Sequence, residues 1–217
     1  MFEINTLLVG LVLVDFVLLG ASRLGTSIRQ IAIQGVLLSL LVLAEHAGWG
    51  APWRVWVLAL GSGVVKAVVF PHFLRRALRE ADVRREMEPY VGFTASILIG
   101  VAALAGALWL AGRLPLPGPV PSTLLVPVAL FTLLVGLFLL VSRRKALTEV
   151  VGYLVVENGV FCFGLALPED APLSVEVGIL LDIFAAVFIM GIMIYHISRE
   201  FDHIDTDRLA ELKDDAA

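Results

Sequence analysis

Seven apolar segments, each long enough to cross a lipid bilayer, constrain this chain more than any other feature of its sequence. They cover roughly residues 4–21, 27–45, 53–74, 92–112, 122–142, 146–167 and 174–198. A helix that crosses the hydrocarbon core needs about 20 mostly apolar residues. The chain is 59% hydrophobic and 17% charged, whereas soluble domains are about 45–50% apolar and about 25% charged. The sequence therefore predicts an all-α integral membrane protein with seven transmembrane helices.

Basic residues in the connecting loops predict how the seven segments are oriented. Lys and Arg concentrate in the cytoplasmic loops of membrane proteins. The side that receives the C-terminal tail holds most of the Lys and Arg residues, whereas the other side holds Arg54 and Arg113. The tryptophans agree, because an aromatic belt marks the membrane interface and they fall near the outer segment ends: Trp49, Trp53, Trp56 and Trp109. We expect the N-terminus outside, the C-terminus in the cytoplasm, and a multi-pass protein of the cell (inner) membrane.

Two stretches of the chain resemble each other and predict an internal repeat. LVLVDFVLLGASR at 11–23 and FTLLVGLFLLVSR at 131–143 align without gaps at an offset of 120 residues. The offset pairs the first three segments with the last three and leaves 92–112 as a connector helix. Equivalent helices then run in the same direction, as in the parallel repeats of membrane transport proteins. Duplication of a purely structural module would produce the same pattern.

The repeat divides the chain into four expected parts. They are 1–78 as the first three-helix repeat, 79–121 as a cytoplasmic segment, the connector helix and a Pro-rich outer loop, 122–198 as the second repeat, and 199–217 as an amphipathic cytoplasmic tail. The tail fits either a helix on the membrane surface or a docking element for a partner protein.

The connector helix carries small residues at four-residue spacing, including Gly92, Ser96 and Gly100. Small residues at this spacing let membrane helices approach each other closely. They predict that the connector packs against another helix.

Ionisable side chains inside the expected spans are the main candidates for function. Glu157 lies roughly 20 Å from the cytoplasmic edge of a hydrocarbon core about 30 Å thick. Lys66 and Asp15 lie roughly 13 Å and 12 Å from that edge, and Asp182 lies about two turns in from the outer side. Charged groups at such depths are costly and usually face the interior of a helix bundle.

The repeat offset relates these residues to one another. It places Glu157 one turn from the position equivalent to Gln34, and Asp182 one turn from the position equivalent to Lys66. Each repeat is therefore expected to carry polar groups on matching faces of its second and third helices.

One interpretation of these residues is a proton path formed by Glu157, Asp182 and Lys66, in which the Asn158 amide hydrogen-bonds a water molecule. Desolvation raises the pKa of a buried carboxylate and a nearby cation lowers it, so such a group can load and release a proton. The alternative is a set of ion pairs that only fixes helix packing. Asp15 with Lys66 is the best candidate for such a structural pair, because the two lie at similar depth.

Further residues are candidates for proton access or for support of the path. Glu149 lies near the cytoplasmic start of 146–167, and His72 lies near the cytoplasmic end of 53–74. Gln34 and Asp15 are expected to support the buried groups. Pro71 removes a backbone hydrogen bond next to Lys66, which either admits water or only shapes the helix.

Several classes of site have no signature in this sequence. There is no clustered Cys/His metal motif, no Gly-rich phosphate loop and no nucleophile elbow. The cytoplasmic loops are too short to hold a catalytic domain. We therefore expect no active site of its own, no metal, no cofactor and no binding of nucleic acid.

Three stretches resemble the hydrogenase-4 component E family: SRRKALTEVVGYLVVENGVFCFGLAL at 142–167, KAVVFP at 66–71, and the region 175–212. The resemblance extends over most of the chain and is strongest from 142 to 212. It includes the pattern GY…EN, which ends in Glu157 and Asn158. The last three segments are also similar to the K subunit of respiratory complex I and to the C subunit of multisubunit cation/proton antiporters.

This resemblance implies a non-catalytic membrane subunit of a hydrogenase-type or complex I-like redox complex. Its expected partners are the lipid bilayer, antiporter-like membrane subunits and a peripheral redox module. Two glutamates on adjacent helices form part of the proton path in the complex I K subunit, and the resemblance implies that Glu157 and Asp182 approximate them. Glu157 is displaced by one turn from the first. A purely structural scaffold subunit and a stand-alone ion transporter are the alternatives.

Overall fold

A computed structural model describes residues 2–45, 53–80, 90–115, 120–143 and 146–167, together with Gly191. Within these ranges the regular elements are helices, and there is no strand. The elements are α1 (Phe2–Gly20), α2 (Leu24–Glu45), α3 (Trp53–Val64), the π-helical turn η2 (Val65–Val69), α4 (Phe70–Glu80), α5 (Phe93–Ala111), α6 (Leu125–Ser142) and α7 (Ala146–Gly164).

Five of these helices are long and apolar enough to cross a membrane: α1, α2, α5, α6 and α7. They correspond to five of the seven segments expected from the sequence. The expected segment 174–198 lies outside the described residues, as does the tail at 199–217. The part of the chain that the structure describes is thus all-helical, as expected for a membrane protein, while the count of seven spans and the internal repeat remain predictions.

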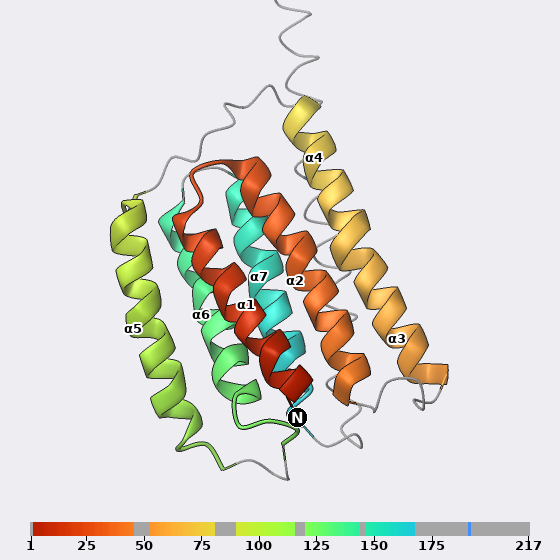
Figure 1. Cartoon of the computed structure of the whole chain (residues 1–217). Helices are drawn as coiled ribbons and strands as arrows, with labels where there is room; N and C mark the ends of the chain where they lie inside the picture. The colour runs from red at the N-terminus through yellow and green to blue at the C-terminus, as the bar shows by residue number, and fades with distance from the viewer. Residues whose placement is uncertain are drawn as a thin grey trace, which may run out of the picture.

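The remaining expected segment, 53–74, is divided into α3, η2 and α4. Figure 1 shows that these three elements form one continuous rod along one side of the bundle. Pro71 has no N–H to donate to the helix ladder, and the π turn Val65–Val69 lies directly before it. The Phe70 N–H bonds the Val65 carbonyl, one residue further back than in an α-helix. The irregularity expected beside Lys66 therefore takes the form of a π turn.

Four helices form the centre of the bundle. α1 packs against α2 and α6, α2 packs against α7, and α6 and α7 make the most extensive contact of all. α5 covers α1 and α6 on one side, and the rod of α3, η2 and α4 lies against α2 on the other (Figure 1). The centre is therefore built from helices that are far apart in the sequence.

Glycines allow the close contact between α6 and α7. A Cβ atom on Gly152 would lie 2.8 Å from the Leu140 backbone nitrogen, and one on Gly159 would lie 2.6 Å from the Leu133 backbone nitrogen. Side chains at these positions would push the two backbones apart. This pair of helices is therefore held by the close approach that small residues permit in membranes.

The packing predicted for the connector helix is confirmed on α5. Its buried residues are Ser96, Gly100 and Ala107. A Cβ atom on Gly100 would lie 3.2 Å from the Phe16 ring of α1. The other faces of α5 expose apolar side chains such as Leu98 and Trp109.

Candidate functional site

A layer of buried polar side chains crosses the bundle. It consists of Asp15 on α1, Gln34 on α2, Lys66 on η2, Thr132 on α6, and Glu157 and Asn158 on α7. None of these six residues is more than 2% exposed. We call this set the polar layer.

Apolar clusters border the polar layer towards both ends of the central helices. One cluster contains side chains such as Leu18, Ile28, Leu139 and Val150. The other contains side chains such as Leu8, Leu38, Val126 and Cys162. On each central helix, the polar residue lies where one cluster gives way to the other. The layer is thus enclosed by hydrocarbon, which makes each unmade hydrogen bond in it expensive.

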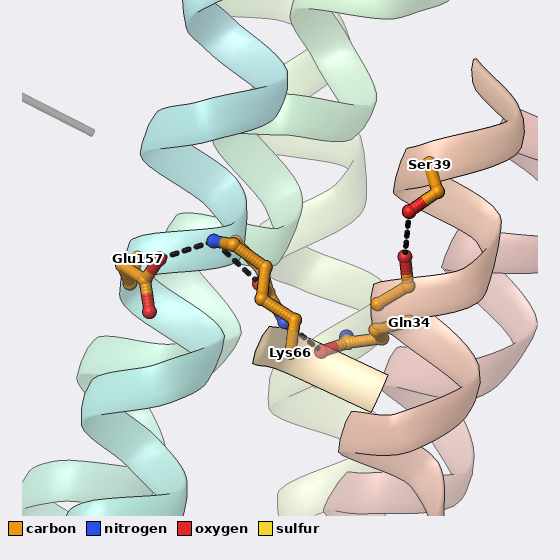
Figure 2. Close-up of polar contacts among 6 residues, drawn as sticks. Gln34, Ser39, Lys66 and Glu157 are labelled. Atoms are coloured by element: carbon orange, nitrogen blue, oxygen red, sulfur yellow. Dashed lines mark hydrogen bonds and ion pairs between the residues drawn. The ribbon is translucent and has the colours of Figure 1, made fainter. Parts of the chain in front are cut away.

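Lys66 and Glu157 form an ion pair inside the layer, with Lys66 Nζ as donor to Glu157 Oε1 (Figure 2). Lys66 Nζ also donates to Asn158 Oδ1 at 3.3 Å and lies 4.9 Å from the centre of the Phe161 ring. These contacts surround the ammonium group with a carboxylate, an amide oxygen and an aromatic ring. A buried ion pair offsets its desolvation cost only when such additional contacts satisfy both charges.

The close approach of α2 and η2 positions the Lys66 side chain. A Cβ atom on Gly35 would lie 2.9 Å from the Ala67 backbone nitrogen and 2.9 Å from the Lys66 carbonyl carbon. Gly35 therefore lets the π turn press against α2, next to Gln34. Figure 2 shows the Lys66 side chain between α2 and α7.

Two side-chain amides continue the polar layer from Lys66 towards α1. Asn158 Nδ2 donates to Gln34 Oε1 at 3.0 Å, and Gln34 Nε2 donates to Asp15 Oδ1 at 2.6 Å. The second oxygen of Asp15, Oδ2, accepts a hydrogen bond from Thr132 Oγ1 at 2.7 Å. Hydrogen bonds and one ion pair thus connect α1, α2, η2, α6 and α7.

The structure brings together most of the residues singled out from the sequence, but it pairs them differently. The suggested pair of Asp15 with Lys66 is not the pairing found here. Lys66 binds Glu157, and Asp15 lies at the far end of the two amides. Depth along the chain did not reveal this, because pairing also depends on the direction in which each helix face points.

Thr132 was missed by the sequence analysis. A Thr in a membrane helix can satisfy its hydroxyl on its own backbone, so the residue type alone did not mark it. The available signal was its place on α6, where it is one of few hydroxyl side chains in an apolar helix.

Three predicted residues are not part of the polar layer as described. Asp182 lies outside the described residues. His72 is exposed on α4, and the centre of its ring lies 6.2 Å from the centre of the Phe73 ring. Glu149 is half-buried in the first turn of α7, about two turns before Glu157. The suggested role of Asp182 in the proton path, and those of Glu149 and His72 in proton access or support, stay predictions.

Arg143 forms a separate buried contact at the end of α6. It is 2% exposed, its Nη2 donates to the Leu19 carbonyl at 3.0 Å, and its guanidinium lies 5.0 Å from the centre of the Phe93 ring. Burial lowers the pKa of Arg143 from its ordinary value, but a guanidinium remains charged at physiological pH. The residue therefore ties α1 and α5 to the end of α6.

In the part of the chain that the structure describes, no group of three or more His, Cys, Asp or Glu side chains is placed to hold a metal ion. Cys162, the single cysteine of the chain, is buried in an apolar cluster.

Comparison with known proteins supports part of the resemblance suggested by the sequence. Hydrogenase-4 component E of Escherichia coli is 37% identical over 86 residues, which is 40% of this chain and 40% of that protein. The same protein of Shigella flexneri matches to the same extent. This match is shorter than the sequence resemblance implied. No protein-family model matches the chain, and no solved structure matches it.

A second relative matches almost the whole chain. The uncharacterised protein Rv0085 of Mycobacterium tuberculosis is 31% identical over 208 residues, which is 94% of this chain and 93% of that protein. Identity at this level along nearly the full length of both chains marks common ancestry, and this chain belongs to the family of the mycobacterial protein.

Proposed function

We propose that this chain is a non-catalytic membrane subunit of a hydrogenase-type or complex I-like redox complex, and that its polar layer takes part in proton translocation coupled to electron transfer. The observation that carries this proposal is the Lys66–Glu157 ion pair buried between two apolar clusters. The partial similarity to hydrogenase-4 component E supports the assignment to a complex of this kind.

A contribution to the stability of the fold does not by itself explain why the chain contains a buried ion pair. Well-packed apolar residues of similar volume often stabilise a protein as well as a buried ion pair does, or better. Ionisable residues within membrane spans usually mark ion pathways or proton relays. The π turn that presents Lys66 is also a feature frequently found at functional sites.

The pair offers a simple way to couple proton binding to a charge movement. Protonation of Glu157 removes the negative charge that compensates Lys66. The ammonium then loses its strongest contact, and its flexible four-carbon stem allows it to turn towards another partner. Return of the carboxylate restores the pair. Proton uptake by Glu157 is thereby linked to the position of Lys66.

The remaining members of the path belong to this proposal as well. Asp182 would extend the path beyond Glu157, with Glu149 and His72 near its cytoplasmic access. We further propose the cell (inner) membrane as the location, with antiporter-like subunits and a peripheral redox module as partners. Seven spans, parallel repeats and a cytoplasmic C-terminus complete this picture.

Substitution of Glu157 in the intact complex tests the proposal. Glu157→Gln keeps the side-chain shape but cannot carry a charge. We expect proton translocation to fall by roughly ten-fold or more, while electron transfer continues. The matched control is Glu3→Gln, which removes an exposed carboxylate at the start of α1. Proton translocation at the native level with unchanged electron transfer would rule out the relay.

The alternative function is a scaffold, and the polar layer itself favours it as the second candidate. Its hydrogen bonds join five elements of the bundle, so the layer can serve to fix their arrangement. A scaffold predicts that Glu157→Gln impairs assembly of the complex, or changes nothing, without uncoupling electron transfer from proton movement. Ion flux through the chain alone in liposomes would instead indicate a stand-alone transporter.

A further inference from the structure

The hydrogen bonds of the two amides all run in the same direction. Lys66 donates to the Asn158 oxygen, the Asn158 nitrogen donates to the Gln34 oxygen, and the Gln34 nitrogen donates to the Asp15 carboxylate. Each amide dipole therefore points its negative end towards Lys66 and its positive end towards Asp15.

The groups at the two ends of this series of hydrogen bonds, Lys66 and Asp15, require the same orientation of the two amides. An ammonium group can only donate, so the Asn158 oxygen must face Lys66. An ionised carboxylate can only accept, so the Gln34 nitrogen must face Asp15. Starting from either end, the remaining amide contact is then a correct donor–acceptor pair. Every donor in this series of hydrogen bonds therefore meets an acceptor only when both amides point the same way.

We propose that Asp15 and Thr132 form a second protonation site, and that the amides of Asn158 and Gln34 couple its charge to that of the Lys66–Glu157 pair. This coupling rests on the proposed function, because it treats the charge of Glu157 as one that changes. It adds a site on α1 and α6 to the one on η2 and α7.

Thr132 allows Asp15 to be either charged or neutral. In the charged state the Thr132 hydroxyl donates to Asp15 Oδ2. A proton delivered by hydronium binds Oδ2 and leaves a water molecule behind, and the new carboxyl O–H then donates to the hydroxyl oxygen. The Thr132 O–H turns towards the main-chain carbonyl one turn earlier, as Thr side chains in helices commonly do. Neither amide has to reverse.

The amides transmit the electrostatic effect of a change in charge, but they do not carry the proton. Neither amide titrates, and each offers one oxygen and one N–H₂ group to its neighbours. Hydrogen bonds in a chain polarise one another, and this effect is strong in a low-dielectric interior. A change of charge at one end therefore alters the hydrogen bonds at the other end.

Few other ionisable groups face Asp15 from the helices packed against α1. α5 and α6 contain no ionisable residue. Directly after α6, Arg143 donates to the Leu19 carbonyl of α1, one turn beyond Asp15. On α2 the ionisable residues are Arg29 and Glu45, which lie towards its two ends. Arg143 stays charged at all accessible pH values, so among these groups the pair of Lys66 with Glu157 is the one whose charge can change together with that of Asp15.

The composition of the chain permits a direct test without altering the amides. The chain has two glutamines, Gln30 and Gln34, and two asparagines, Asn5 and Asn158. Gln30 is one turn before Gln34 on α2, and Asn5 accepts a hydrogen bond from Ser122 at 2.6 Å. Side-chain ¹⁵N labelling of the full chain in lipid nanodiscs therefore yields two reporter amides and two internal controls.

In the native chain, a pH titration followed by NMR should move the Gln34 and Asn158 signals with one common midpoint. The Gln30 and Asn5 signals should stay still at that midpoint. An unmoved Gln34 signal, or separate midpoints for Gln34 and Asn158, would overturn the coupling.

Two variants show which residue causes the NMR transition. Asp15→Asn should abolish the common transition at both reporter amides. Glu157→Gln leaves the Lys66 charge uncompensated, which favours the Asp15 carboxylate, so the Gln34 transition should move by about one pH unit to lower pH. A Gln34 transition that is the same in Glu157→Gln and the native chain contradicts the inference. If Asp15→Asn fails to fold, the native chain and Glu157→Gln still decide.

This experiment uses neither electron transfer nor proton translocation, so its failure can be told apart from failure of the proposed function. If the transitions are coupled but proton translocation is normal in Glu157→Gln, the proposed proton relay is wrong and the coupling between Asp15 and the Lys66–Glu157 pair is supported. Uncoupled amides together with lost translocation would keep the relay and remove Asp15 from it.

Discussion

Lys66 brings a full positive charge to a position that is 2% exposed. Its carboxylate, amide and aromatic contacts come from α7, and Gly35 of α2 makes room for its backbone. The charge is therefore tolerated through contacts from two helices that are separate in the sequence. Loss of one partner of such a pair is more damaging than loss of both, because it leaves a buried charge without compensation.

A double-mutant cycle tests whether the charges of Lys66 and Glu157 compensate each other. Each single substitution, Lys66→Met or Glu157→Leu, should lower the free energy of unfolding by about 3–5 kcal/mol. The double variant should be close to the native chain, since it replaces the pair with apolar side chains. Denaturant unfolding of the purified chain in detergent, followed by circular dichroism, measures these values. Additive losses in the double variant would show that the two side chains do not interact.

Two elements of the bundle place the polar layer. The π turn η2 presents Lys66, and Gly35 of α2 lets η2 approach. The glycines of α6 and α7 hold Thr132 and Glu157 on adjoining helices at a short distance between backbones. Geometry at the site thus depends on residues that carry no polar group.

Gly35→Ala tests the role of α2 at the scale of the element. The added Cβ atom would meet the Ala67 and Lys66 backbone at 2.9 Å, so α2 and η2 must move apart. We expect a loss of about 1–3 kcal/mol in the free energy of unfolding, together with a weakened Lys66–Glu157 pair. Gly61→Ala on α3 is the matched control, because nothing lies within 4 Å of its added Cβ atom. Equal stability of the two variants would mean that α2 and η2 do not pack as described.

In the folded bundle, the polar layer is buried between two apolar clusters. Cys162 belongs to one of these clusters and is 1% exposed. Because it is the single cysteine of the chain, its thiol reports on whether the bundle is closed as a unit.

A membrane-permeant maleimide should react with Cys162 at least roughly a hundred-fold more slowly in the folded chain than in the unfolded chain, because reaction requires local opening. A Cys162→Ala chain that carries Ser22→Cys serves as the control, since Ser22 is exposed between α1 and α2. Mass spectrometry of time-resolved labelling measures both rates. Fast labelling of Cys162 in the folded chain would place it outside the core.

The amino-acid sequence is enough to predict the helical class, the apolar spans at α1, α2, α5, α6 and α7, and the buried position of residues such as Glu157 and Lys66. These features follow from local composition, because the thickness of the bilayer sets the length of a span and the cost of a charge sets its depth. The small-residue face of α5 was predictable from the four-residue spacing of its small side chains.

The identity of the polar residues that contact one another became known only from the folded arrangement of the helices. It paired Lys66 with Glu157, placed Asp15 beyond two amides, and added Thr132 to the layer. Partners depend on the rotation and the axial shift of each helix, and these are set by non-local contacts such as Gly35 against η2. A π turn also changes the direction of every side chain that follows it, and no local pattern of hydrophobicity encodes that change.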